Sequence, residues 1–194
     1  MPFVASESFS RFVSLACHDL RTPLATVSGF AHTLVGMDEI GDPAARYIGI
    51  MRAAGEQMGE LLDALGLVAR IEGGRYEPAL IEVDSLELAQ AAAARVDKAS
   101  ASGSGGAVRV DREPVEAGLA ALALCTARHG GLEHVELTAS GSIVEIAPIP
   151  AAAAPIVLAE DMKDLGAAAA RQVTEAIGGS FELDGERLLV RFPA

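Results

Sequence analysis

The residue types best suited to chemistry lie in one short segment near the N-terminus, Cys17-His18-Asp19-Leu20-Arg21-Thr22-Pro23-Leu24. His18 falls off the helical series of apolar residues around it, so we expect its imidazole to face solvent. A neutral imidazole is a nucleophile, and Asp19 can hold or take the proton on its other ring nitrogen. The pair therefore suits acceptance of a phosphoryl group, although a surface histidine beside an aspartate is usually just a solvated pair.

Two neighbours of His18 fit the same chemistry. Thr22 lies one helical turn further on, on the face of His18, where its hydroxyl can position a water or a phosphoryl oxygen. Arg21 can offset the charge of a phosphate, and Pro23 removes a helical N–H and can kink the helix just past His18.

A helical hairpin is predicted to position this segment. Apolar residues recur at spacings of three and four within 9–34 and again within 48–69, and Asp42 in the loop between them is the expected N-cap of the second helix. That helix is predicted from Pro43 to about Glu72, and at 1.5 Å per residue it is roughly 45 Å long. Because an isolated hairpin of that length cannot cover its apolar faces, we expect two copies to pair as a four-helix bundle. The alternative is that the hairpin packs on the rest of its own chain.

The remainder of the chain predicts a second, mixed domain, which places the domain boundaries at 1–76 and 77–194. Strands are expected at 80–84, 107–111, 135–138, 143–146, 180–183 and 187–192, and helices at 85–99, 113–128 and 161–177. Ser100–Gly106 is predicted to be a flexible loop, and Pro148–Pro155 a second loop. Gly178-Gly179 is predicted to cap a helix C-terminus. This order favours an α+β fold with helices on one face of a mixed sheet.

Composition excludes several classes of protein. With 194 residues, 51% of them hydrophobic, the chain can bury a core, and a disordered chain is excluded. The net charge of −12 argues against a nucleic-acid partner, and the absence of a long apolar run argues against a membrane span. Cys17 and Cys125 show no disulfide or metal-ligand spacing, so we expect two buried thiols in a reducing compartment and a cytoplasmic protein.

The segment around His18 resembles the H-box of the sensor histidine kinases. The hairpin is similar to their dimerisation and histidine-phosphotransfer domain, Ala69–Gly74 to the exit of its second helix, and Glu82-Val83-Asp84 to the first strand of their catalytic domain. The resemblance implies a Bergerat-like α/β sandwich after the hairpin. It also implies that His18 is the phosphoacceptor, Asp19 its acid/base partner and Thr22 the residue that positions a hydrolytic water.

The sequence departs from that family where the family binds ATP. The first helix of the family's catalytic domain carries two asparagines that hold Mg-ATP, but the matching positions here are Ala121 and Cys125, and the chain contains no asparagine. Ala147–Pro155 stands where the adenine-binding aspartate is expected, and the later Gly-x-Gly box retains Gly166 alone. The segment between them is too short for an ATP lid. We therefore expect the domain to keep its fold without a functional ATP site.

This combination resembles the histidine phosphotransferases of bacterial phosphorelays. It implies transfer from phospho-Asp on one receiver domain to His18 and then to Asp on another, with Mg²⁺ supplied by each receiver and with no cofactor or metal bound by this chain. Two alternatives are a histidine kinase, ATP-dependent or partner-assisted, and a non-catalytic or phosphatase-type regulator of a response regulator. No sensor domain precedes Phe9 in this sequence, so we expect any signal to arrive through a protein partner.

A receiver docking surface is predicted next to His18. The small residues Ala25, Thr26, Gly29 and Thr33 continue the stripe of Thr22 at helical spacing, so we expect a receiver helix to pack against them. The alternative is that these small residues serve packing within the bundle. His32, His129 and His134 are expected to be ordinary surface residues.

Overall fold

The computed structural model describes residues 21, 24–25, 27–29, 31–32, 34–35, 42–161 and 163–194. The chain divides into two compact units, Met1–Arg75 and Tyr76–Ala194, so the division falls one residue from the expected domain boundary. His18, Asp19, Thr22, Thr26, Thr33 and Cys17 lie outside the described residues. In the described part of the chain, no helix is both long and apolar enough to cross a membrane.

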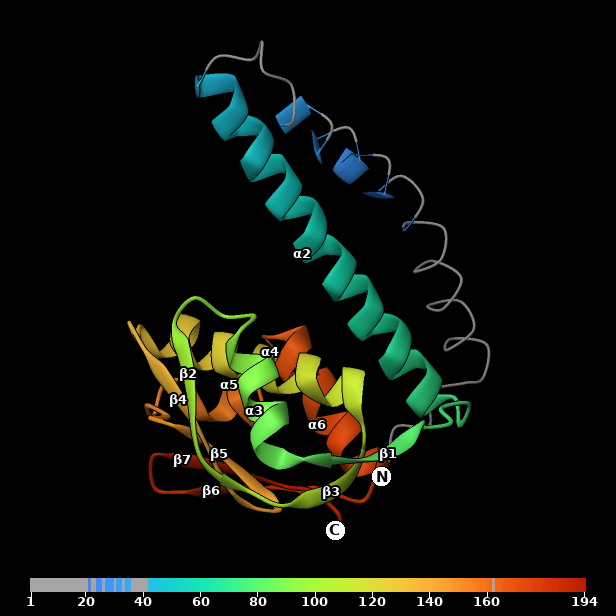
Figure 1. The fold of residues 1–194 in the computed structure, drawn as a ribbon, viewed down its shortest axis with the longest axis vertical. Helices are drawn as coiled ribbons and strands as arrows, with labels where there is room; N and C mark the ends of the chain where they lie inside the picture. Colours follow the sequence, from blue (N-terminus) through green and yellow to red (C-terminus); the bar gives the residue numbers. More distant parts are fainter. Residues whose placement is uncertain are drawn as a thin grey trace. The chain divides into compact units, whose positions relative to one another are not determined.

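The N-terminal unit contains helix α2, Asp42–Glu72, as the apolar periodicity predicts (Figure 1). The helix ends in a tight left-handed turn at Gly74, which has φ +63°. There the Gly74 N–H donates to the Ile71 carbonyl at 3.0 Å and the Arg75 N–H donates to the Arg70 carbonyl at 2.8 Å. This is a Schellman motif, which satisfies carbonyls that the end of the helix leaves without a partner.

The described residues between 21 and 35 are also helical, and they pack against α2 through a glycine. A Cβ on Gly55 would lie 2.3 Å from the Ser28 Oγ and 3.8 Å from Leu24 Cδ1. Leu24 and Ala31 are 8% and 2% exposed, so they form the inner side of this contact. The predicted hairpin packing is therefore present within one chain.

Several large apolar side chains among the described residues of this unit are exposed. The exposed large hydrophobic residues of the unit are Val27, Leu34, Val35, Ile50, Met51, Met58 and Leu61. Side chains of this type rarely gather on an exposed helix surface unless another surface covers them. Their exposure is compatible with the dimeric bundle expected from the sequence, which stays a prediction.

The C-terminal unit contains two sheets and a layer of helices (Figure 1). Strands β1 (Leu80–Asp84) and β3 (Ala107–Asp111) form a small antiparallel sheet. The larger sheet has the order β2-β4-β5-β7-β6, with β2 parallel to β4 and the other pairs antiparallel. Its strands are β2 (Ala99–Gly105), β4 (Val135–Gly141), β5 (Ile143–Ala147), β6 (Ser180–Asp184) and β7 (Arg187–Arg191).

The core of this unit lies between the larger sheet and its helices. The helices are α3 (Ser85–Ala93), α4 (Arg112–Gly130), the short α5 (Ala154–Val157) and α6 (Leu165–Ala176). Alternate residues of the central strands are fully buried, among them Val135, Leu137, Val144, Ile146, Leu188 and Val190. Such alternation is typical of a sheet with one covered face, and it confirms the predicted mixed sheet with helices.

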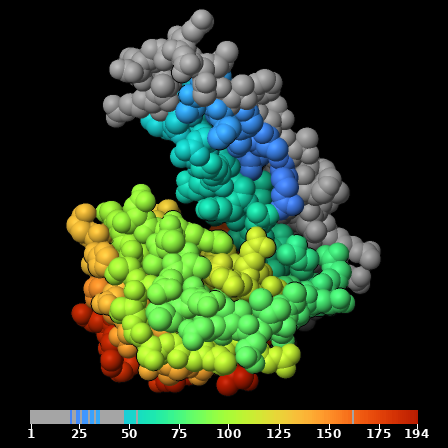
Figure 2. All heavy atoms as spheres, viewed as in Figure 1, coloured from blue at the N-terminus to red at the C-terminus, as the bar shows by residue number. Residues whose placement is uncertain are grey.

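The predicted loop Ser100–Gly106 is wrong, because Ala99–Gly105 forms strand β2. This strand has no buried residue, and in Figure 2 yellow-green atoms from this part of the chain lie on the surface of the unit. Backbone pairing with β4 holds it, and the Ser102 hydroxyl donates to the Glu136 carboxylate at 2.8 Å. Backbone hydrogen bonds do not depend on side-chain type, so a Ser/Gly segment can pair wherever a neighbouring strand is available.

Three smaller expectations also need correction. Helix α3 ends at Ala93 instead of about Ala99, because the chain leaves the helix to enter β2. The short helix α5 occupies the end of the predicted loop Pro148–Pro155. Helix α6 begins at Leu165 instead of Asp161, because Asp164 is its N-cap and accepts a hydrogen bond from the Ala167 N–H at 3.0 Å.

The predicted glycine cap of α6 is confirmed. Gly178 has φ +86°, and its N–H donates to the Glu175 carbonyl at 3.0 Å. The Gly179 N–H donates to the Thr174 carbonyl at 2.8 Å, which completes a second Schellman motif.

Candidate functional site

The described residues of the H-box helix show where its surface lies. Arg21 is exposed and forms an ion pair with Asp63 of α2. Ala25 and Gly29 are exposed, and a Cβ on Gly29 would meet no described atom within 4 Å. His32 is exposed, as expected. The two described members of the predicted docking surface therefore face away from the contact that Leu24 makes with α2.

The positions that resemble the nucleotide-binding residues of histidine kinases lie where α4 and α6 meet. Small residues bring the two helices together: a Cβ on Gly166 would lie 2.8 Å from the Ala121 Cβ, and one on Gly118 would lie 3.3 Å from the Ala170 Cα. Contacts below 3.0 Å are not tolerated by real Cβ atoms, so Gly166 is required for this packing. Ala121 and Gly166 are therefore in direct contact.

Cys125 lies one turn after Ala121 and is fully buried, as expected for this thiol. Desolvation by burial is the largest cause that raises the pKa of the Cys125 thiol from 9.0 to about 12, and the neighbouring Asp164 carboxylate raises it further by charge and by a hydrogen bond. The thiol is therefore protonated at neutral pH. A protonated, buried thiol is a poor nucleophile, so Cys125 is unsuited to covalent catalysis.

His129 is not the ordinary surface residue that the sequence predicted. Its Nε2 atom is buried and has no hydrogen-bond partner among the described residues, and it lies 3.7 Å from the Asp164 Oδ2. One ligand atom each from Cys125, His129 and Asp164 lie within 4.8 Å of one another. Cys125 and His129 are four residues apart on one helix, a spacing visible in the sequence, whereas Asp164 joins them only through the α4–α6 contact. His134 is exposed, as predicted.

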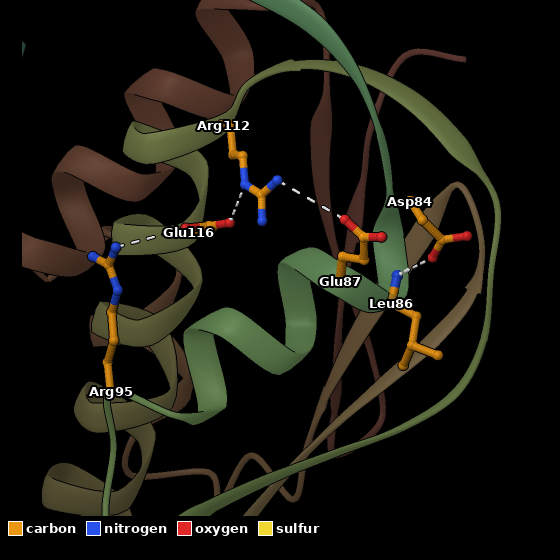
Figure 3. A network of polar contacts seen from close by, with 6 residues as sticks. All are labelled: Asp84, Leu86, Glu87, Arg95, Arg112 and Glu116. Carbon is orange, nitrogen blue, oxygen red and sulfur yellow. Dashed lines mark hydrogen bonds and ion pairs between the residues drawn. The ribbon is translucent and has the colours of Figure 1, made fainter.

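An acidic residue at the start of α4 anchors this helix on its other side. Glu116 is only 8% exposed, and its carboxylate accepts a hydrogen bond from the Arg112 Nε at 2.7 Å (Figure 3). The Arg95 guanidinium lies 3.6 Å from the other oxygen of Glu116, and Arg112 lies 3.9 Å from Glu87 of α3. The network connects α4 to α3 and to Arg95, which follows α3. We infer that the role of this network is to position α4.

The segment between β5 and α6 is packed as core. Ile149, Ala153 and Val157 are 2%, 0% and 0% exposed, and the Ile149 N–H donates to the Glu186 carbonyl at 2.7 Å. It overlaps Ala147–Pro155, the stretch in which the resemblance to the histidine kinases leads us to expect an adenine-binding aspartate and the sequence has none.

Comparison with known proteins places these two units in context. Residues 10–74 match the His Kinase A (phospho-acceptor) domain. An uncharacterized sensor-like histidine kinase of Rhizobium meliloti (strain 1021) is 30% identical over 77 residues, which are 38% of this chain and 14% of that protein. This chain therefore spans a small part of that relative's length.

Solved histidine kinases have a similar fold. Full-length ShkA in complex with AMPPNP superposes with a TM-score of 0.63 at 21% identity, over 94% of this chain and 45% of ShkA. The Acinetobacter baumannii histidine kinase AdeS superposes with a TM-score of 0.55 at 16% identity, over 91% of this chain and 97% of AdeS. Residues 10–74 therefore match the His Kinase A (phospho-acceptor) domain, and the fold of the chain is similar to that of solved histidine kinases.

Proposed function

We propose that this protein is a phosphorelay histidine phosphotransferase that moves a phosphoryl group between receiver aspartates through His18. The matched phospho-acceptor domain, residues 10–74, includes the H-box, which supports His18 as the phosphoacceptor. In the forward step a ring nitrogen of His18 attacks the phosphorus of an aspartyl phosphate, a P–N bond forms, and the receiver carboxylate leaves with the electrons of the P–O bond. Asp19 holds the proton on the other ring nitrogen.

The second step is the reverse reaction on another receiver. Its aspartate attacks the phosphorus on His18, the P–N bond breaks, and neutral imidazole is regenerated. Such transfers depend mainly on positioning and on charge stabilisation, which Arg21 and the Mg²⁺ of each receiver would supply. Thr22 would position a water where hydrolysis competes with transfer.

The observation that carries this proposal over a kinase is the direct contact between Ala121 and Gly166. Ala121 stands where the family has an Mg-ATP asparagine, and the contact leaves an apolar surface there. The second asparagine position is the buried, protonated thiol of Cys125, and a thiol is a poor ligand for Mg²⁺. We therefore propose that the C-terminal unit holds no nucleotide and serves as a structural part of the phosphotransferase.

Dimerisation and receiver binding belong to the same proposal. The exposed apolar residues of the N-terminal unit would be covered by a second copy, which gives a four-helix bundle. The exposed Ala25 and Gly29 would contact the receiver together with Thr22, Thr26 and Thr33.

An ATP-dependent histidine kinase is the second candidate. The sequence match to a sensor-like histidine kinase and the fold shared with ShkA, which was solved with AMPPNP, favour it. The third candidate is a phosphatase-type regulator, which would use Thr22 and never hold phosphate on His18.

The test offers two phosphoryl donors to the purified full chain. With γ-labelled ATP and Mg²⁺ we expect no acid-labile phosphate, and with a phosphorylated receiver we expect labelling that His18→Ala abolishes. Labelling of His18 by ATP would contradict the proposal and establish the kinase. If neither donor labels His18 but the receiver loses its phosphate, the protein is the regulator.

A further inference from the structure

We propose that Cys125, His129 and Asp164 form a binding site for a zinc-class divalent cation, which links α4 to α6 within the C-terminal unit. The ligand atoms of the three side chains already lie within 4.8 Å of one another. They offer one sulfur, one imidazole nitrogen and one carboxylate oxygen. This donor set suits Zn²⁺ and Co²⁺, whereas Mg²⁺ and Ca²⁺ require oxygen ligands.

The backbone holds the three ligands in place. Cys125 and His129 are one turn apart on α4, so both side chains lie on the same face of that helix. Asp164 is fixed as the N-cap of α6, where its Oδ1 accepts the Ala167 N–H at 3.0 Å. Its other oxygen, Oδ2, faces His129. The cap therefore aims one carboxylate oxygen at the cluster.

The His129 ring gives independent evidence that a ligand belongs in this cluster. Its Nε2 atom is buried without a hydrogen-bond partner among the described residues, which is costly unless something satisfies it. The distance of 3.7 Å from Nε2 to the Asp164 Oδ2 is too long for a hydrogen bond. Two ligand atoms that each lie 2.0 Å from a tetrahedral zinc ion are about 3.3 Å apart. The observed distance between Nε2 and Oδ2 is close to that value.

The exposure and the charge of the three side chains are suited to the binding of a cation. Cys125 is fully buried, whereas the side chains of Asp164 and His129 are 12% and 24% exposed, so an ion can enter past these two residues. On binding, the Cys125 thiol would lose its proton to solvent, which leaves thiolate and carboxylate to balance the two charges of the cation. Arg128 lies 3.7 Å from the same carboxylate oxygen, but its side chain is half exposed and can turn to solvent. Three protein ligands leave the fourth tetrahedral position to water.

The test uses Co²⁺ as a spectroscopic probe on the metal-stripped full chain. All proteins carry Cys17→Ser, so that Cys125 is the one thiol that remains. We expect one equivalent of Co²⁺ to produce a sulfur-to-cobalt charge-transfer band, which Zn²⁺ then displaces. Absence of the band, or Co²⁺ binding to Cys125→Ser that is as tight as binding to the parent, would overturn the proposal.

A matched variant covers the case in which Cys125→Ser does not fold. Asp164→Asn keeps a good N-cap on α6 but removes the carboxylate. We expect it to weaken Co²⁺ binding by more than the roughly 10–100-fold that loss of an outer-shell partner costs. We also expect Zn²⁺ to raise the melting temperature of the parent protein but not of Asp164→Asn.

The control is His134→Gln, because the His134 ring is exposed and lies 2.8 Å from the Ser100 Oγ, outside the cluster. It should bind Co²⁺ as the parent does. Equal loss in His134→Gln and in Asp164→Asn would mean that surface histidines bind the ion, and it would refute the site. The inference does not use phosphoryl transfer, so it stands or fails independently of the proposed function.

Discussion

The guanidinium of Arg21 pairs with the carboxylate of Asp63, so the second helix of the hairpin holds the arginine that is proposed to stabilise a phosphoryl group on His18. Both side chains are more than half exposed, at 55% and 68%, so the pair contributes less than about 1 kcal/mol to stability. Its importance is orientation, because it sets where the guanidinium starts before a phosphate arrives.

This pair gives the first prediction. Arg21→Ala should slow transfer from a phosphorylated receiver to His18 at least about tenfold, since a hydrogen bond to a charged group contributes roughly 1.5–3 kcal/mol. Asp63→Asn should leave the rate unchanged or raise it, because Arg21 keeps its charge and loses a competitor. Single-turnover transfer measures both, and an Arg21→Ala protein as fast as the parent would remove Arg21 from the site.

Gly29→Arg should block receiver transfer without unfolding the protein. A Cβ at Gly29 meets no described atom within 4 Å, and replacing a helical glycine raises helix propensity, so stability should not fall. The bulk would stand on the proposed docking surface and weaken receiver binding. Transfer kinetics and a thermal melt check this, with Gly49→Arg on α2 as the control, because that glycine also has open space around it. Unchanged transfer in Gly29→Arg would refute the docking surface.

Charges on the exposed apolar surface of α2 should separate the proposed dimer. Met51 and Met58 are 51% and 56% exposed in the single chain, and a glutamate at either position would place an unpaired charge in the dimer interface. We expect Met51→Glu and Met58→Glu to shift the molar mass in light scattering from two copies to one. Gln57→Glu, which adds the same charge at an exposed position of α2, should remain dimeric. A monomeric parent protein would contradict the bundle.

A side chain at Gly166 should loosen the contact between α4 and α6. Its Cβ would lie 2.8 Å from the Ala121 Cβ, and overpacking of this kind costs about 1–3 kcal/mol. We expect Gly166→Val to lower the free energy of unfolding by that amount, measured by urea denaturation. The double variant with Ala121→Gly should lose less than the sum of the two single variants, because the second change makes room. Strict additivity would show that the two residues do not share this contact.

Stability should fall at alkaline pH because of Cys125. Below pH 9.0 the thiol is protonated in both states, but between 9.0 and about 12 it ionises in the unfolded chain and stays protonated in the fold. The contribution of the protonated thiol to the free energy of unfolding is therefore complete below the pKa of the unfolded chain. It is lost, at up to ~1.4 kcal/mol per pH unit, as pH rises above that value. Denaturation in a chelator at several alkaline pH values should show a shallower loss for Cys125→Ala than for the parent. If the free energy of unfolding fell equally steeply with pH in both proteins, the raised pKa of Cys125 would be refuted.

The elements that the sequence predicted well are those whose signal is local. The apolar period of α4 predicted 113–128, close to the observed Arg112–Gly130, because each turn of a helix depends on residues three and four apart. Strand β2 was missed for the opposite reason. Its Ser/Gly composition is typical of a linker, and only its parallel partner β4, more than thirty residues later, makes it a strand.

The same contrast applies to the candidate functional residues: those with a local signal could be found from the sequence, and Asp164 could not. The H-box could be found because its chemistry lies within one run of residues, and Cys125 and His129 are visible at helical spacing. Asp164 could not be added, because it reaches them only when Gly166 and Ala121 let α6 approach α4. That contact depends on the absence of side-chain atoms, and a sequence pattern gives little sign of which small residues will face each other.

The edge position of strand β2 also has a consequence that we expect at high protein concentration. It is an edge of the larger sheet, and an edge strand can recruit a strand from another molecule and begin aggregation. Here Gly103 interrupts the extended backbone with φ +107°, and the strand offers serine, glycine and alanine in place of bulky apolar side chains. A second chain would find an uneven backbone and little apolar surface to bury. The composition that makes this strand resemble a linker in the sequence therefore makes this edge of the sheet a poor template for a strand from another molecule.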